Sequence, residues 1–317
     1  ARKVVDHLVD SNLFGHDSHG AIRLPEYVRA IKDEDRFKAR AEVSIVRESP
    51  CTAVVDNGSA LGQVGGTFAM QLAMEKARKH GTATVSLRRT SHVGRVGAYP
   101  LMAAREGLIG LAFVNAGRFG RQIAPFGGID GRISTNPIAF AAPRRGTDPI
   151  MVDLTTSVVA EGKVRVAVNK GVQVPEGWLI DGDGRSTTDV GPALESPPLH
   201  ALLPLGGLVA GHKGFALSLI IDVLAGALSG AGCSAGKVEI TDVNGLFVLA
   251  IDPEQFGIGA VDIGVNLDAE SGVAWDVVAV IHRDFDHADA DHGHQEHHQV
   301  AAPVLRHVAA RGHDPSA

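Results

Sequence analysis

The sequence predicts an α/β fold, and three features of the chain support this class. Its 317 residues are 44% hydrophobic, which is enough for a large buried core. From residue 82 onward, apolar segments with a strand pattern alternate with segments of helical pattern. The 38 glycines predict many tight turns. The alternation places strands over 82–87, 108–115, 138–142 and 149–153, and a helix near 96–105.

Helices are also expected near the N-terminus. The apolar residues in 1–13 recur at helical spacing, and a second helix is expected from Leu24-Pro25, with Tyr27, Val28 and Ile31 sharing a face. A strand around 53–55, a turn at Asp56-Asn57-Gly58 and a helix over 67–80 follow. Further along, a long loop is expected at 182–196 and a buried helix at 215–228.

Composition excludes several classes of protein. The net charge of -6 leaves no basic surface for a phosphate backbone, so nucleic acid is not an expected partner. The apolar run 215–228 contains an aspartate and is shorter than the roughly 20 residues of a membrane span. Cys51 and Cys233 show no metal or redox spacing, and no signal peptide is visible. A soluble, cytoplasmic protein is therefore expected.

The common enzyme fingerprints do not fit this chain. The nearest approach to a Gly-x-Gly-x-x-Gly dinucleotide motif is Gly230-Ala231-Gly232 with Gly236 beyond it. These glycines follow a helical apolar run instead of a strand, so a helix terminator is the better interpretation. A His-Glu-x-x-His zinc motif does not occur, and the Gly-x-Ser-x-Gly pattern at Gly232-Cys233-Ser234-Ala235-Gly236 follows the same helical run instead of a strand, so it lacks the context of a nucleophile elbow.

The first candidate site is the segment from Asp17 to Tyr27. It holds an imidazole (His19), a guanidinium (Arg23) and a phenol (Tyr27) close together in sequence. His19 can exchange a proton with a carbonyl or hydroxyl oxygen near neutral pH, and Arg23 can hold a carboxylate in a bidentate fork. The same residues would also suit an exposed, polar helix-entry turn.

Two further segments carry candidate residues. Ser91-His92-Val93-Gly94, followed by Tyr99, comes directly after an apolar strand, where α/β proteins keep their sites, although a loop histidine can be structural. The run from Val152 to Ser157 ends a strand with one carboxylate and three hydroxyls, and Gly162-Lys163 follows it. Such groups can bind phosphate or ribose, but they also suit helix capping.

Taken in order, these segments and several others resemble the malate/L-lactate dehydrogenase family, whose members include ureidoglycolate dehydrogenase and diketogulonate reductase. The resemblance runs from about 17 to 228. Besides the three segments above, it is carried by Ala124-Pro125-Phe126-Gly127-Gly128, Thr135-Asn136-Pro137, Pro175-Glu176-Gly177-Trp178 and Gly211-His212-Lys213-Gly214-Phe215.

The resemblance implies a non-Rossmann α/β fold with a mixed sheet and helical flanking segments, in a homodimer. It implies hydride transfer between the C4 atom of NAD or NADP and the C2 atom of a small 2-hydroxy or 2-oxo acid. His19 would exchange the proton, Arg23 would bind the carboxylate, and Tyr27 and His92 would complete the pocket; in some relatives the His92 position has the acid/base role, so the choice stays open. The cofactor would contact Val152, Asp153, Leu154, Thr155, Thr156, Ser157, Val158, His212 and Lys213.

Three segments are expected: a helical segment over 1–45, an α/β core over 46–255 and an atypical segment over 256–317. In the last, the family's Pro-Gly-Glu segment is not found, and 284–298 is instead rich in aspartate and histidine. A solvated tail explains this composition and no metal site is expected, although a metal-dependent enzyme built on the tail is one alternative. The other is a degenerate homologue without cofactor affinity.

Overall fold

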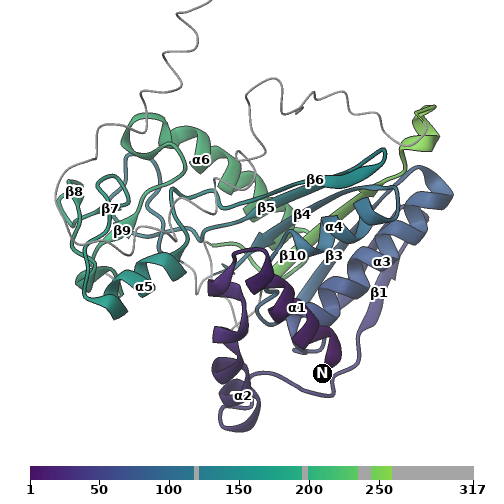
Figure 1. Cartoon of the computed structure of the whole chain (residues 1–317), viewed down its shortest axis with the longest axis horizontal. Helices are drawn as coiled ribbons and strands as arrows, with labels where there is room; N and C mark the ends of the chain where they lie inside the picture. The colour runs from purple at the N-terminus through teal and green to yellow at the C-terminus, as the bar shows by residue number, and fades with distance from the viewer. Residues whose placement is uncertain (118–120, 195–198, 235–243, 259–317) are drawn as a thin grey trace, which may run out of the picture. The chain divides into compact units, whose positions relative to one another are not determined.

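A seven-stranded mixed sheet forms the centre of the protein, as the computed structural model shows (Figure 1). The structure describes residues 1–117, 121–194, 199–234 and 244–258. Only β2 and β3 pair in parallel, and the other neighbours are antiparallel. The order is β1 (Ser44–Glu48), β2 (Thr52–Asp56), β3 (Thr82–Thr90), β10 (Asn244–Ile251), β4 (Ile109–Asn115), β5 (Ile138–Arg144) and β6 (Thr147–Leu154). The predicted α/β class with a mixed sheet is confirmed.

Two helices cover the sheet and form the main core with it. α3 (Gly62–His80) is the crossover between the parallel strands β2 and β3, and α4 (Ala98–Arg105) packs against β4 and β5. Met70 and Met74 of α3 are fully or almost fully buried against β3 and β10. The predicted helix at 67–80 is therefore correct but begins earlier, at Gly62.

The strand β10 was not among those expected from the sequence, although it lies between β3 and β4 in the middle of the sheet. Leu246, Val248 and Ala250 of this strand are fully buried. Its apolar residues are bounded by Asn244-Gly245 and Asp252-Pro253, which are turn signals that could have identified it.

A smaller sheet has its own core. It has the order β8 (Ser186–Thr187), β7 (Leu179–Ile180) and β9 (Ala201–Leu202), and α5 (Glu161–Lys170) packs in the same hydrophobic cluster through Val164. The predicted loop at 182–196 thus contains the short strand β8 and a 3₁₀ turn at Gly191–Leu194. Residues 195 and 196 of that loop lie outside the described ranges.

The N-terminal helices α1 (Arg2–Leu13) and α2 (Leu24–Lys32) occur where the sequence predicted them. On α2, Tyr27 and Ala30 form the buried face, whereas Val28 is 42% exposed and the expectation for that residue was wrong. The division into 1–45, 46–255 and 256–317 stays a prediction. The histidine-rich stretch 284–298 and Gly236 lie outside the described residues.

The expected buried helix at 215–228 is instead the end of α6 (Gly207–Ile221) and a π-helical segment, Asp222–Ala227. Its inward face consists largely of small residues, Gly211, Gly214 and Ser218, because the helix backbone lies directly on Leu205. The large apolar side chains point outward, and Val209 is 90% exposed. The prediction of burial for 215–228 was therefore wrong for about half of its residues, and Ile221 is the large apolar residue there that is fully buried.

By length and composition, Gly207–Ala227 could cross a membrane; its mean hydropathy is 1.6 and 33% of it is buried. One such helix is weak evidence for a membrane protein. Asp222 lies within it, and its carboxylate is bonded to Asn115 and to the backbone and hydroxyl of Ser234. Those bonds attach the segment to the sheet and its neighbouring turn.

Candidate active site

The fold brings His19, Tyr27 and His92 together, although His92 is distant from the other two in sequence. His19 lies in a 3₁₀ turn, Asp17–His19, and its ring stacks on His92 with a centroid distance of 5.3 Å and an interplanar angle of 21°. Tyr27 Oη lies 2.7 Å from His92 Nδ1. Both histidines are half-buried, whereas Tyr27 is 2% exposed.

The loop that carries His92 is held by its contacts with α3. A Cβ atom on Gly62 would lie 2.4 Å from the carbonyl oxygen of His92, so only glycine allows this approach. The backbone N–H of Gly62 donates to Ser91 Oγ at 2.9 Å. Tyr99 Oη donates to the carbonyl oxygen of Val93. The first turn of α3 and the start of α4 thus fix the position of the His92 backbone.

A histidine from α1 holds the same loop from the other side. The backbone N–H of Arg95 donates to His7 Nε2 at 2.9 Å. Gly94, with φ +75°, leaves room for the His7 ring, because a Cβ there would lie 2.3 Å from Nε2. Neither His7 nor this contact was found from the sequence, where His7 is one of many residues on a helix.

A chain of hydrogen bonds leads from α3 to His92. Gln63 Nε2 donates to Tyr27 Oη at 2.9 Å, and Tyr27 Oη lies 2.7 Å from His92 Nδ1. Gln63 is fully buried in the first turn of α3. The sequence analysis did not identify it, since a single glutamine near a helix start carries no spacing signal.

Burial keeps the clustered imidazoles neutral. It lowers the pKa of His92 from 6.5 to about 3, and the positive charge of Arg23 and, when it is protonated, that of His7 add to the effect. The pKa of His19 is also well below its usual value, because of burial, then His92 and Arg23. Burial and Arg95 lower the pKa of His7 to about 4, and burial raises that of Tyr27 to about 12. The unliganded site therefore favours an anion.

Arg23 is fixed beside the histidines by two partners. Its Nε donates to the carbonyl oxygen of Ser18 at 2.7 Å, and Nη1 bonds Glu26 Oε2 at 2.9 Å. The Arg23 side chain is 24% exposed. A substrate carboxylate on the Nη edge would therefore compete with Glu26 for Nη1.

The run from Val152 to Val158 has largely internal partners. Asp153 Oδ2 accepts the backbone N–H of Gly97 at the start of α4, 2.7 Å away. Burial raises the pKa of this carboxyl to about 6. Thr156 Oγ1 donates to the carbonyl oxygens of Thr135 and Asn136, and Ser157 Oγ donates to that of Val159. The hydroxyls of Thr156 and Ser157 thus shape the segment. The next helix, α5, has Ala160 at its N-cap and no side-chain cap, so the capping interpretation was wrong.

The Gly162-Lys163 pair lies close to the first candidate site. A Cβ on Gly162, in the first turn of α5, would be 2.9 Å from Ser18 Cβ. The first turn of α5 therefore packs directly on the residue before His19. This contact joins the smaller hydrophobic core to the 17–27 segment.

The other predicted cofactor residues, His212 and Lys213, are exposed on α6. The His212 ring lies edge-on to Phe126, with centroids 5.4 Å apart, and Phe126 is 44% exposed. Gly211 lies against Phe126 and Pro204, where a Cβ would be 3.1 Å and 2.9 Å from their side chains. An exposed imidazole, ammonium and aromatic ring together suit an anionic dinucleotide.

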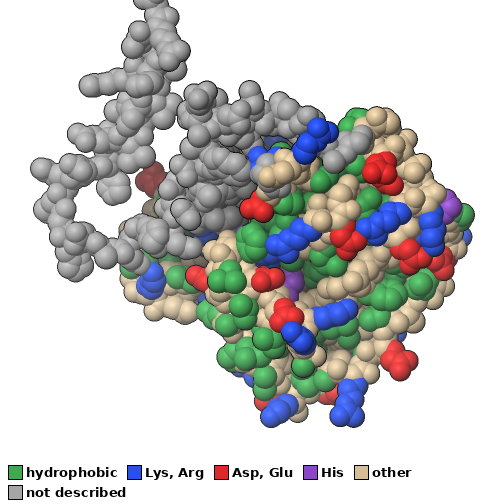
Figure 2. Space-filling view, turned by 45° about the vertical axis from the view of Figure 1, so that its right-hand side comes forward, with side chains coloured by type: hydrophobic (Ala, Val, Ile, Leu, Met, Phe, Trp, Pro, Cys, Tyr) green, Lys and Arg blue, Asp and Glu red, His purple; other side chains and the backbone are tan. Residues whose placement is uncertain are grey.

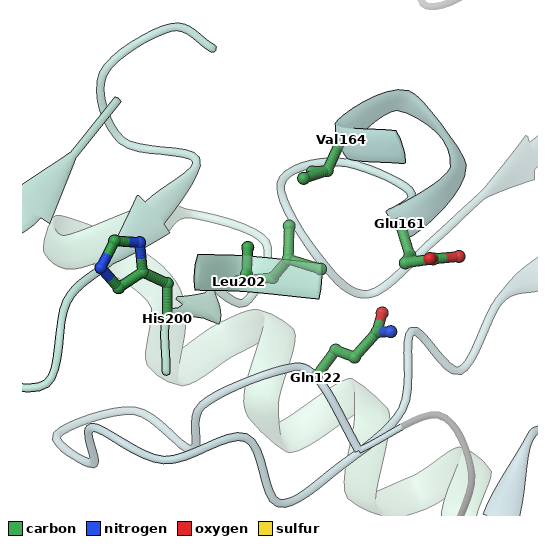
Figure 3. A pocket seen from close by; sticks show the side chains of 6 residues that line it. Gln122, Glu161, Val164, His200 and Leu202 are labelled. Atoms are coloured by element: carbon green, nitrogen blue, oxygen red, sulfur yellow. The ribbon is translucent and has the colours of Figure 1, made fainter. Parts of the chain in front are cut away.

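A separate small pocket lies between α5 and β9 (Figure 3). Figure 3 shows His200 and Glu161 at its opposite ends, with Leu202 between them. Its lining is Gln122, Glu161, Val164, Ala193, His200 and Leu202. None of the predicted site residues lines it, so we place the candidate site at the histidine pair. Within the described ranges, no group of three or more His, Cys, Asp or Glu side chains could hold a metal ion.

Paired imidazoles beside a guanidinium can exchange a proton and bind a carboxylate, as a dehydrogenase acting on a 2-hydroxy acid requires. Residues 1–262 match the family model described as malate/L-lactate dehydrogenase. The chain belongs to this family.

Individual relatives agree with the family match. The malate dehydrogenase of Pyrococcus abyssi is 41% identical over 262 residues, covering 81% of this chain and 70% of the relative. The L-lactate dehydrogenase of Cupriavidus necator is 39% identical over 269 residues, covering 84% and 74%. The solved structure of sulfolactate dehydrogenase from Methanocaldococcus jannaschii superposes with a TM-score of 0.71 at 33% identity, covering 93% and 79%.

The predicted family, fold and oxidoreductase class are therefore confirmed. Membership of a dehydrogenase family implies a nicotinamide cofactor and a small-molecule hydroxy acid substrate. These relatives are dehydrogenases, so they give no support to the degenerate homologue.

Acid should destabilise the protein through His92. His92 has a pKa of about 6.5 in the unfolded chain and about 3 in the folded protein. Between these two values the unfolded state binds one more proton, so the free energy of unfolding decreases as pH falls from 6.5 to 3. Asp153 acts oppositely, because its raised pKa of about 6 favours the folded state at low pH. We expect His92→Gln to lose less stability than the wild type between pH 6.5 and 4, as measured by urea denaturation.

Exposed His80 at the end of α3 provides the control for this experiment. His80→Gln should retain the wild-type dependence on pH. Parallel stability curves for wild type and His92→Gln would show that His92 is not held neutral by the fold.

Proposed function

We propose that this protein catalyses reversible hydride transfer between NAD or NADP and a small 2-hydroxy or 2-oxo acid. The observation that carries the proposal is the contact of His19, Tyr27 and His92 beside Arg23. Proton donors and a carboxylate-binding cation are what the protein must supply to this reaction, and the cofactor supplies the hydride when it is bound. The names of the malate and lactate dehydrogenase relatives support the substrate class.

In this proposal Arg23 binds the substrate carboxylate and His92 exchanges the proton at its Nε2 atom. His92 Nδ1 is already held by Tyr27, so Nε2 is the free nitrogen of that ring. His19 also has a bonded Nδ1, at 2.9 Å from Ser18 Oγ, but this partner is its own neighbour in sequence. The bound carboxylate would offset the positive charge of Arg23, which now lowers the pKa of His92, and so favour proton uptake.

The cofactor would lie along Val152 to Val158 and contact His212 and Lys213. The exposed ammonium of Lys213 and imidazole of His212 fit a phosphate, and the exposed ring of Phe126 fits an apolar contact with a base or ribose. In the first segment, the hydroxyls of Thr155, Thr156 and Ser157 all bond within the protein, so the contribution of this segment would come from its backbone.

A homodimer formed through α6 and its π-helical extension is also part of the proposal. The apolar side chains of this helix that point outward would be covered by the same helix of a second copy. They are Leu208, Val209, Leu217, Leu219, Ile220, Val223 and Leu228. Asp222, bonded inward to Asn115, favours this arrangement over a membrane span.

The proposal includes neither nucleic acid nor a membrane as a partner. Figure 2 shows acidic and basic side chains interspersed on the visible face, where no large basic patch occurs among the coloured residues. We place the protein in the cytoplasm, which the two free thiols, Cys51 and Cys233, suit.

The dimer can be tested by sedimentation. We expect the wild type to sediment as a dimer, and Ile220→Glu, which puts a charge on a side chain that is 54% exposed, to sediment as a monomer. Val5→Glu on α1, where the side chain is 53% exposed, should stay dimeric. A monomeric wild type would contradict the proposed interface.

Catalysis can be tested by following oxidation of NADH and NADPH with a panel of 2-oxo acids. We expect turnover with at least one combination of cofactor and oxo acid. In His92→Ala, kcat should fall by about 10²–10⁴-fold, which is the range that acid/base catalysis supplies. His19→Ala should reduce kcat less, and exposed His80→Ala should leave it unchanged. A large fall in kcat in His19→Ala alone would assign the acid/base role to His19 instead of His92. The absence of turnover with every oxo acid tested would contradict the proposed function.

The carboxylate role of Arg23 has its own prediction. Arg23→Ala should raise KM for the oxo acid by about 10–100-fold, because a charge-assisted hydrogen-bond pair contributes about 1.5–3 kcal/mol. Arg29→Ala removes an exposed arginine from α2, the helix that follows Arg23, and should leave KM unchanged. An unaltered KM in Arg23→Ala would show that the carboxylate binds elsewhere.

A further inference from the structure

Gln63 is held in the site by only one end of its amide. The side chain is fully buried, and its Nε2 donates to Tyr27 Oη at 2.9 Å. Its Oε1 is buried without a hydrogen-bond partner among the residues that the structure describes. A buried, unpaired carbonyl oxygen is costly, so its presence here calls for an explanation. The hydrogen bonds of its neighbours, Tyr27 and His92, explain why this oxygen has no partner.

In the observed arrangement, Gln63 Nε2 can only donate, so Tyr27 Oη accepts from it. The hydroxyl hydrogen of Tyr27 has one acceptor among the described residues, His92 Nδ1 at 2.7 Å, so the arrangement that pairs this buried hydrogen directs it to Nδ1. Neutral His92 must then accept at Nδ1 and carry its proton on Nε2. Gln63 thus selects the tautomer of His92 through Tyr27.

The opposite arrangement is needed when His92 gains a proton. An imidazolium carries hydrogen on both nitrogens, so Nδ1–H would donate to Tyr27 Oη. The hydroxyl hydrogen of Tyr27 would then need another acceptor. Rotation of the Gln63 amide by a half-turn would present Oε1, which has no other described partner to lose.

We propose that Gln63 is a positioning residue for proton transfer, and that its amide turns over to serve both protonation states of His92 through the Tyr27 hydroxyl. This inference rests on the proposed function, in which His92 Nε2 exchanges the proton with substrate. In oxo acid reduction the imidazolium of His92 gives its Nε2 proton to the substrate oxygen, so that N–H bond breaks, an O–H bond forms, and His92 keeps its other proton on Nδ1, still donated to Tyr27 Oη. The resting tautomer, with its proton on Nε2, regains the imidazolium state by accepting a solvent proton on Nδ1, and the Gln63 amide turns in that step. A glutamine suits the position because one neutral group offers both a donor and an acceptor.

The ionisable groups facing His92 come from several elements. Tyr27 lies on α2 and His19 in the first 3₁₀ turn. Arg23, in the second 3₁₀ turn, is a fixed cation, and His7 on α1 opposes protonation of His92 when it is itself protonated. All of them are present in a Gln63 variant. A changed proton affinity of His92 in such a variant would therefore come from position 63.

Two substitutions of similar size should act in opposite directions. Gln63→Met offers Tyr27 no acceptor, so protonated His92 would leave a buried hydroxyl hydrogen unpaired, and the pKa of His92 should fall by about one unit, a ten-fold loss in proton affinity. In Gln63→Glu, an ionised carboxylate accepts only, and that pKa should rise by about one unit or more.

The measurement is the pH dependence of kcat for oxo acid reduction. The pH above which kcat declines should move down in Gln63→Met and up in Gln63→Glu, with KM little changed. Exposed Gln71, on the same helix, provides matched controls, and Gln71→Met and Gln71→Glu should show no shift. In a Tyr27→Phe background both Gln63 shifts should disappear, because the hydroxyl that relays them is gone.

A second readout is independent of activity. It uses the NMR spectrum of substrate-free protein with ¹⁵N-labelled histidine. The signals of His92 are identified as those that are missing from the spectrum of His92→Gln. At neutral pH we expect an unprotonated Nδ1 in the wild type and a protonated Nδ1 in Gln63→Glu. A protonated Nδ1 in the wild type overturns the relay even if no variant folds. The relay would also be overturned if the pH dependence of kcat moved in the same direction in both Gln63 variants, or if it still moved in the Tyr27→Phe background.

Discussion

The hydrogen bond between Tyr27 and His92 is the contact on which the candidate site depends, because it joins segments 65 residues apart. One belongs to an N-terminal helix and the other to the loop after β3. The first turn of α3 touches both, with Gly62 against the His92 backbone and Gln63 bonded to Tyr27. Two adjacent residues of one helix thus set the distance between the phenol and the imidazole, and the core beneath α3 keeps that helix in place.

Electrostatics in this region follows from the same packing. Burial brings His7, His19 and His92 near one another and near Arg23, so each positive charge opposes the protonation of the others. Without a ligand, the fixed charge of Arg23 therefore keeps the imidazoles neutral. An anionic substrate would offset that charge and make proton uptake easier, which couples carboxylate binding to acid catalysis in the proposed reaction.

The helix α6 shows how small residues determine orientation. Gly214 lets the helix backbone approach Leu205 so closely that a Cβ would lie 2.5 Å from its backbone nitrogen. Glycine and serine therefore occupy the inward face and the larger apolar residues occupy the outward face. Hydrophobicity alone predicts burial for such a segment, and it does so correctly only if another surface covers it.

The sequence by itself determined the α/β class, five of the seven strands of the main sheet and the chemical types gathered around His19 and His92, because apolar periodicity and short motifs are local properties. It did not determine that β10 lies at the centre of the sheet, that α6 faces outward or that Gln63 and His7 hold the site. Strand order, helix orientation and hydrogen bonds between distant segments depend on which surfaces meet when the chain packs, and only the tertiary structure decides that.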